Sequence, residues 1–418
     1  MTSPHRRTLV TYPFVLVAVL FFLSFPGFFS NIGLSNSHAL GMIFSVIPIA
    51  LISLVTRDWM PFTKREFQAS LVLLSIILLH FLCVSLVGGI DTYSSSSAQS
   101  RFVLSFVLLV IFLWAAFQLE RYISALEKLK FTRLIVTIYW LLVVLALASL
   151  PFHWFDWVTR KQMLIFSEPS HFAVVFSPFL FYQILTSSHR YKHLFLCFSL
   201  ALLLQNVTLI VTGCLGILLS VKRYGIFKIL SIFMLVLFVA VFITYFRDFF
   251  GFLLSRNILD PDSQNLSVLV FLSGLERAYI TTFESYFLGV GFQQMGVIGP
   301  LGELQTRIMS QTDGDLMNIF EGGSLFSKLT VEFGVMGILC CLAYLVKAVR
   351  IFRLSRSLAI SDNKEIFYMA SFLSIFILLF VRSVGYFTPS SFLVLVGLVG
   401  LSRLDRRRTR SIKESFLT

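Results

Sequence analysis

Charged residues are scarce in this chain. Asp, Glu, Lys and Arg together make up 13% of its 418 residues, whereas hydrophobic residues make up 57%. A soluble domain of this length does not contain repeated apolar runs of about 20 residues, the length that crosses a bilayer core. These runs also lack the alternation of apolar and polar positions that marks transmembrane strands. Because every backbone group must be hydrogen-bonded within the bilayer, the sequence predicts an all-α polytopic membrane protein.

Disulfide and cofactor signatures are also absent. The five cysteines all fall within apolar runs, so the polar loops offer no disulfide framework and no zinc-ligand spacing. The run Gly289-Val290-Gly291 is too isolated to indicate a glycine-rich phosphate loop. We therefore expect neither a metal ion nor a cofactor.

About 12 transmembrane helices are predicted, in a single integral membrane domain that covers residues 1–418. The first apolar stretch is too long for the core of a signal peptide and lacks a small-residue cleavage site, so we expect it to act as a membrane anchor. The predicted spans are residues 11–30, 38–56, 67–89, 102–119, 134–152, 171–187, 194–206, 208–221, 225–246, 324–346, 366–381 and 386–402.

The loops between these spans differ in basic charge. With the N-terminus inside, 25 of the 34 Lys and Arg residues fall on inner segments, and the bias holds loop by loop. The positive-inside rule then predicts that both termini are cytoplasmic. The net charge of +13 is explained by this orientation and by contact with anionic lipid, so it does not require a nucleic acid partner. Residues 403–418 are predicted to be a basic cytoplasmic tail.

Two features predict a cleft that opens to the outer side. Residues 194–221 leave one basic loop and return to the next within 28 positions. Each leg then has about 14 residues, roughly 21 Å, which is shorter than a bilayer core. The turn near Gln205 and Asn206 should therefore lie below the outer surface, and the outer turn at 382–385 is similarly tight. Polar backbone at such depth is tolerated where protein or water covers it.

Two outer loops are long enough to carry function. Residues 247–323 form a large extracytoplasmic loop, and residues 153–170 form a second one. Within the large loop, residues 266–288 show helical spacing of apolar positions, with Glu276, Arg277 and Glu284 on the polar side. We expect an amphipathic helix there that lies over the membrane face.

Ionisable residues at membrane depth are costly, and they indicate function unless a structural role explains them. Arg101 could instead extend its side chain to the interface. The Glu168 region could instead cap a helix, with Ser167 or Ser170 as the N-cap and the carboxylate favoured by the helix dipole. The candidates are Arg101, Glu168, His171, Arg277, Glu332 and Arg382.

Two more candidates have structural alternatives within their own helices. Arg277 could pair with Glu276 or Glu284 on a solvated face. Glu332 lies four residues after Lys328, and a structural ion pair within the helix is the favoured interpretation for it. Arg382, at a tight outer turn, is the hardest to explain structurally.

Together these residues predict a site for a lipid pyrophosphate on the outer side. Arginine binds phosphate oxygens through a planar bidentate fork. A nearby carboxylate or imidazole could remove a proton from an attacking hydroxyl group. Pyrophosphate is a good leaving group once its charge is matched, so no nucleotide is needed.

The same residues resemble motifs of a known family. Residues 167–173, SEPSHFA, and Arg277 followed by the GVGF of 289–292 resemble elements of bacterial Wzy-type surface-polysaccharide polymerases. Residues 332–337, EFGVMG, resemble a span start that these polymerases share with O-antigen ligases, and Arg382 with GYF at 385–387 resembles the closing polymerase motif. The likeness runs from about residue 90 to 402. The ligases carry His-Asn at the positions where this chain has Gly323 and Ser324. The missing histidine favours a polymerase.

The resemblance implies a metal-independent membrane glycosyltransferase. Its donor and acceptor would be polyprenyl-pyrophosphate-linked oligosaccharides, and its product O-antigen, capsule or exopolysaccharide. The implied location is the bacterial inner membrane, with a chain-length regulator and a flippase as further partners. Carried over to this chain, the resemblance makes either Glu168 or His171 the base and lets arginines hold the pyrophosphate. The implied catalytic residues are Glu168, His171 and Arg277, and the implied substrate-binding residues are Arg101, Arg382 and Tyr386.

Two other functions are compatible with the sequence. One is an O-antigen ligase-like transferase. The other is a secondary transporter or a flippase for lipid-linked glycans, because twelve helices suit many transporters. Transporters often contain an internal repeat, and residues 1–209 and 210–418 show none that is convincing. The charged residues also cluster at the outer boundary and not at the bilayer midplane, which favours the transferase.

Overall fold

The structure is a computed structural model, and it describes residues 12–31, 38–88, 95–154, 163–220, 265–355, 362–383 and 385–415. The predicted span at 225–246, much of the loop at 153–170 and the first part of the loop at 247–323 lie outside these residues. Within the described ranges the secondary structure is helical, apart from two isolated β-bridges.

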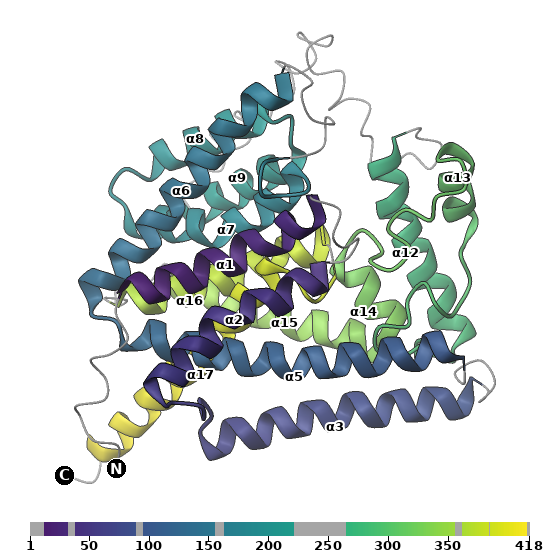
Figure 1. The fold of residues 1–418 in the computed structure, drawn as a ribbon, viewed down its shortest axis with the longest axis horizontal. Coiled ribbons are helices and arrows are strands. Elements are labelled where there is room, and N and C mark those ends of the chain that lie inside the picture. The colour runs from purple at the N-terminus through teal and green to yellow at the C-terminus, as the bar shows by residue number, and fades with distance from the viewer. Residues whose placement is uncertain are drawn as a thin grey trace.

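Eight of the described helices are long and apolar enough to cross a membrane. The chain is therefore an all-α polytopic membrane protein, as the sequence predicts (Figure 1). The helices are α1 (Tyr12–Asn31), α2 (His38–Thr56), α3 (Lys64–Val87), α5 (Ser96–Ala125), α6 (Lys128–Trp154), α7 (Pro169–Thr186), α8 (Arg190–Leu203), α9 (Val207–Ser220), α12 (Leu266–Glu284), α13 (Glu303–Gln311), α14 (Leu325–Phe333), α15 (Val335–Ser355), α16 (Asn363–Phe380) and α17 (Pro389–Ser415).

The helices α7 and α16 form the centre of the bundle, and other helices pack around them. Every residue of α7 from Phe172 to Ile184 is buried, which is the pattern of a helix that is apolar on all sides and enclosed by protein. By contrast, α3 and α15 expose apolar side chains such as Leu79 and Val346. These two helices present the surface expected of a protein that faces lipid.

An ion-pair network fixes one end of the bundle. Arg403 of α17 forms a bidentate pair with Glu66 of α3, with both N–O distances at 3.0 Å, and it also pairs with Glu120 of α5. Arg406 adds a second contact to Glu66 at 2.6 Å. Tyr368 of α16 donates to Glu120. The first two basic residues of the predicted tail are therefore bound by protein carboxylates and not by lipid alone.

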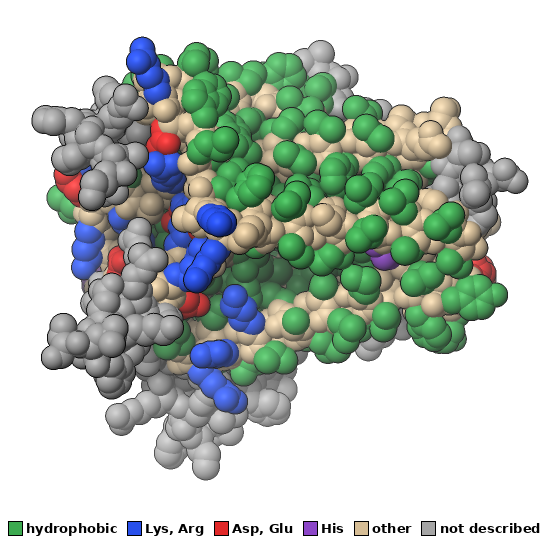
Figure 2. All heavy atoms as spheres, turned by 90° about the horizontal axis from the view of Figure 1, so that it is seen from below, with side chains coloured by type: hydrophobic (Ala, Val, Ile, Leu, Met, Phe, Trp, Pro, Cys, Tyr) green, Lys and Arg blue, Asp and Glu red, His purple; other side chains and the backbone are tan. Residues whose placement is uncertain are grey.

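We call this the basic end, because Lys and Arg side chains gather toward it on the face shown in Figure 2. Helix α5 carries Glu120 at the basic end and Arg101 nineteen residues earlier. At 1.5 Å per residue the two positions are about 28 Å apart, close to the thickness of a bilayer core. Arg101 therefore lies at the opposite end of the bundle.

The predicted short hairpin is confirmed. Helices α8 and α9 have 14 residues each and pack against one another. Asn206 makes the turn, since its side-chain oxygen accepts a hydrogen bond from the amide of Leu209 at 2.8 Å and so caps α9. However, the turn lines none of the cavities described below, so the predicted cleft does not have this turn as its floor.

The predicted span at 324–346 is wrong as a single helix, because the chain breaks at Gly334 into α14 and α15. Gly334 has φ 56° and ψ −132°, a conformation that favours glycine. A side chain there would also collide with the carbonyl oxygen of Phe287. The break therefore comes from a close backbone approach by the loop after α12.

Helix α12 runs across the direction of α3 and α5 and lies beside their ends (Figure 1). By length and composition alone it could also be a span. Its crosswise direction agrees with the predicted helix over the membrane face. His80 of α3 contacts the carbonyl of Leu288, just after α12, at 2.9 Å and so ties the two parts together.

Candidate functional site

A cavity of about 840 Å³ lies at the end opposite the basic end. Its volume is within the range of small-molecule sites. Two cations, Arg101 and Lys328, and one carboxylate, Glu321, are in its wall. The lining residues are Ala39, Ser97, Ser100, Arg101, Leu104, Ser105, Gln293, Gly296, Val297, Phe320, Glu321, Lys328, Gly385, Tyr386 and Phe387.

Phe320 links the two cations of this cavity. The guanidinium carbon of Arg101 lies 3.9 Å from the centre of the Phe320 ring, a cation–π contact. The ammonium group of Lys328 donates a hydrogen bond to the Phe320 carbonyl. The two positive charges therefore contact the same residue, one at its ring and one at its backbone carbonyl. Arg101 lines the cavity, so extension to the interface alone does not describe its position.

Lys328 and Glu332 form the predicted ion pair, with an N–O distance of 3.2 Å. The side chains are only 2% and 0% exposed, so the pair is not on a solvated helix face. The Lys328 ammonium also lies 5.2 Å from the ring centre of Tyr386, another residue of the cavity wall. The pair is thus intrahelical, and at the same time its cation belongs to the cavity.

The glycine motifs explain how this pair is held. The amides of Val290 and Gly291 donate to the carbonyls of Val331 and Glu332 at 2.9 and 2.8 Å. Gly289 has φ 82°, and a Cβ atom there would lie 2.6 Å from the amide nitrogen of Gly334. The GVGF and EFGVMG motifs therefore pack backbone against backbone. Only glycine permits so close an approach, which fixes the end of α14 beside the cavity.

Arg277 is enclosed by protein. Its side chain is 1% exposed, and one guanidinium nitrogen donates to the carbonyl of Ile319 at 2.6 Å. Neither acidic neighbour on α12 pairs with it, because Glu276 instead accepts the amides of Glu303 and Leu304 and caps α13. The structural alternative of a pair with Glu276 or Glu284 is therefore wrong. Arg277 lines neither this cavity nor the smaller pocket described below, and it holds the segment that precedes Phe320.

Glu168, Arg382 and His171 lie together in a second, smaller group. Arg382 pairs with Glu168 at 3.0 Å, and the hydroxyl of Ser170 donates to the same carboxylate oxygen at 2.9 Å. Glu168 is the N-cap of α7, but its side chain makes no capping hydrogen bond. The carboxylate is therefore used for Arg382, and capping does not explain it.

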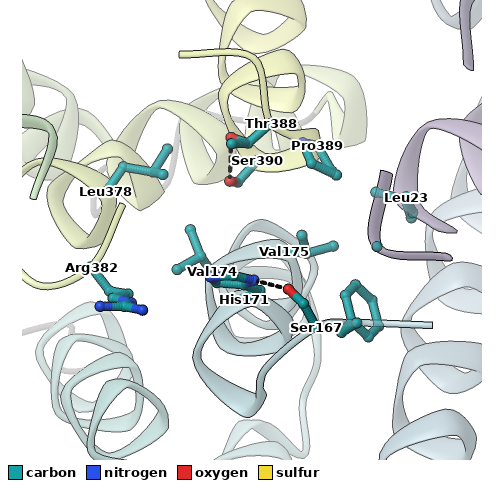
Figure 3. Close-up of a pocket in the computed structure, with 12 residues that line it drawn as sticks. Leu23, Ser167, His171, Val174, Val175, Leu378, Arg382, Thr388, Pro389 and Ser390 are labelled. Carbon is teal, nitrogen blue, oxygen red and sulfur yellow. Dashed lines mark hydrogen bonds between the residues drawn. The ribbon is translucent and has the colours of Figure 1, made fainter. Parts of the chain in front are cut away.

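The pocket beside this group is very small, about 20 Å³, which is room for about one water molecule. His171 and Ser167 are hydrogen-bonded to each other on one side of it (Figure 3). Thr388 and Ser390 are hydrogen-bonded on the other side, and Arg382 lies at its edge (Figure 3).

One segment separates the two sites. Arg382 and residues 388–390 line the small pocket, whereas residues 385–387 line the large cavity. The segment is anchored where the amide of Ser383 donates to the carbonyl of Gly323 at 3.0 Å. The described residues of this segment, 382–383 and 385–387, thus separate the two sites, and we call them the partition.

The predicted site residues therefore divide into three groups. Arg101 and Tyr386 line the large cavity, His171 and Arg382 line the small pocket, and Glu168 is paired with Arg382 beside it. Arg277 belongs to neither. Sequence reasoning missed Glu321 as a candidate and treated Lys328 only as a partner of Glu332. No pattern in the sequence indicates that residue 321 lies beside residue 101.

Among the described residues, no group of three or more His, Cys, Asp or Glu side chains could hold a metal ion. No family model, no curated protein and no solved structure matches this chain.

Proposed function

We propose that this chain is a membrane glycosyltransferase that polymerises polyprenyl-pyrophosphate-linked oligosaccharide repeat units. The observation that carries the proposal is the cavity of about 840 Å³ with Arg101 and Lys328 in its wall, at the end of the bundle away from most basic residues. Two cations that both contact Phe320, one on its ring and one on its carbonyl oxygen, suit a diphosphate group. The motif resemblance described above supports the same function.

The orientation follows from the charge distribution. We assign the basic end to the cytoplasm, because basic residues of multi-pass proteins are enriched there. Both termini are then cytoplasmic, in a bacterial inner membrane, and the cavity opens at the outer face. A lipid-linked oligosaccharide that has crossed the membrane would meet the cavity there.

The wall of the cavity suits each part of such a substrate. Leu104 and Phe387 supply an apolar surface for the polyprenyl chain, and Leu104 is also exposed on the outside of the bundle. Arg101 and Lys328 balance the charge of the diphosphate as it leaves. The hydroxyl and amide groups of the wall can bind sugar hydroxyls; they belong to Ser97, Ser100, Ser105 and Gln293.

The group of Glu168, His171 and Arg382 lies on the other side of the partition from this cavity. Glu168 and His171, the two bases implied by the resemblance, lie with Arg382 next to the segment that carries Tyr386. Arg277 acts as a positioning residue for the loop that carries Phe320. A flippase and a chain-length regulator would be partners of the reaction.

Gene deletion followed by gel analysis of the surface glycan tests the proposal. Loss of a polymerase leaves a single repeat unit on the anchor, and the wild-type gene restores long chains. Loss of a ligase leaves no glycan on the anchor, and loss of a flippase leaves the repeat units on the cytoplasmic leaflet. Either of the last two patterns would overturn the polymerase assignment.

A further inference from the structure

We infer that Glu321 is the general base of this transferase and that the reaction takes place in the cavity of Arg101 and Lys328. The inference rests on the proposed function. It replaces Glu168 and His171, which the family resemblance implies, with a residue that only the three-dimensional arrangement shows.

The carboxylates of Glu321, Glu332 and Glu168 differ in their access to the cavity. Glu321 lines the 840 Å³ cavity. Glu332 is 0% exposed and pairs with Lys328 behind the wall. Glu168 lines neither that cavity nor the small pocket, and the room beside its partner Arg382 is about 20 Å³. A sugar does not fit in that pocket. Although the Glu168 side chain is 34% exposed, it does not face the large cavity, so a hydroxyl group of a sugar bound there lies next to Glu321 and not Glu168.

The backbone on the N-terminal side of Glu321 is held by three cations. Arg277 binds the carbonyl of Ile319, Lys328 binds the carbonyl of Phe320, and Arg101 stacks on the Phe320 ring. A catalytic side chain needs this kind of fixed position, because small displacements lower the rate strongly.

On the C-terminal side, glycines hold the segment. Gly322 lies so close to Gly274 of α12 that a side chain on Gly274 would collide with it. Facing the segment, a Cβ atom on Gly385 would lie 3.8 Å from Oε1 of Glu321. The carboxylate therefore sits next to the partition, and it also interacts electrostatically with Arg101.

This arrangement supplies each group that the transfer needs. The hydroxyl oxygen of the acceptor's terminal sugar attacks the anomeric carbon of the donor, and a new C–O bond forms. The bond from that carbon to the diphosphate oxygen breaks, and its electron pair leaves with the polyprenyl diphosphate beside Arg101 and Lys328. The hydroxyl proton passes to Glu321 and then to water. No oxidant, reductant or metal is required for this balance.

The test compares three substitutions in the full-length protein, reconstituted in vesicles with a defined lipid-linked oligosaccharide. Glu321→Gln is expected to lower turnover by roughly 10²-fold to 10⁴-fold, the usual effect of removing a general base. The KM for the lipid-linked substrate should change less than about twofold. Glu168→Gln should retain much more activity than Glu321→Gln. Glu303→Gln, in an exposed pair with Arg307 on α13, is the matched control and should behave as wild type.

Three further measurements keep the outcome decisive. Glu321→Asp should recover part of the turnover, and Glu321→Gln should still bind the substrate and migrate as a folded protein. Wild-type turnover in Glu321→Gln, or loss of substrate binding in that variant, would overturn the assignment. A larger loss of turnover in Glu168→Gln would return the role to Glu168. If the wild-type protein lengthens no chains under these conditions, the proposed function itself fails.

Discussion

The ammonium group of Lys328 lies 3.2 Å from a carboxylate oxygen of Glu332, and both side chains are buried at the end of α14. A buried ion pair is held together as long as both partners are present, because either charge alone would lack compensation. Here α14 ends at Phe333, one residue after Glu332, and Gly334 follows where the GVGF loop crosses it. The charge that faces the cavity is therefore fixed by a helix end and a glycine loop together.

Removing one partner of this pair should destabilise the protein more than removing both. Lys328→Met leaves Glu332 buried without its cation, and we expect a loss of about 3–5 kcal/mol. The double variant Lys328→Met with Glu332→Leu should recover much of the thermal stability, measured as Tm in detergent, but not the transferase activity. Glu303→Gln, which breaks an exposed pair, should change stability by no more than about 1 kcal/mol. A double variant less stable than both single ones would contradict the pairing.

Arg382 and Glu168 should be linked in function. Arg382→Ala is expected to abolish chain lengthening while the protein still inserts into the membrane, because it frees the carboxylate that holds α7 to the partition. Glu168→Gln keeps one hydrogen-bonding oxygen and should be milder. The measurement is polymer length on a gel at equal amounts of protein in the membrane. Polymer of normal length in Arg382→Ala would show that the partition does not need this contact.

Arg101 should not be replaceable by lysine. Its planar guanidinium stacks on Phe320 at 3.9 Å, and it can also offer two parallel N–H donors to a phosphate group. A lysine keeps the charge but loses both the stacking plane and the fork. We expect Arg101→Lys and Arg101→Ala to lower turnover to a similar extent, by at least about tenfold, a barrier change of roughly 1.4 kcal/mol. Full activity in Arg101→Lys would mean that a point charge is enough.

The sequence predicts much of the helical framework and little of the site. Helix α2 has the predicted bounds, and the α8–α9 hairpin follows from its 28 positions between basic clusters, since local hydrophobicity decides both. The break at Gly334 is not predictable in that way. It depends on Phe287, which is 47 positions earlier in the chain, and the apolar pattern continues through it.

The same difference between local pattern and distant contacts explains which site residues could be predicted from the sequence. Arg101, Glu168 and Arg382 are identified because charge at a span end is unusual in itself. Glu321 is not, because a carboxylate in a polar loop is ordinary and only its neighbour Phe320 brings it next to Arg101. Arg277 is also unusual by position, yet its burial against Ile319 could not be inferred from α12 alone, since a helix pattern does not show which loop covers it.

Two of the glycines with positive φ, Gly334 and Gly314, should respond very differently to substitution by alanine. Gly334→Ala adds a Cβ that collides with the Phe287 carbonyl and strains a residue with φ 56°. Gly314 has φ 91°, and nothing lies within 4 Å of a Cβ built there. Backbone strain of about 1–3 kcal/mol applies to both, so the difference between their Tm values measures the contact with residues 287 and 288, just before the GVGF motif. We expect Gly334→Ala to lower the Tm far more than Gly314→Ala and to abolish chain lengthening, because the loop no longer holds the end of α14 beside the cavity. Equal Tm values for the two variants would mean that the loop and the helix end are not packed as described.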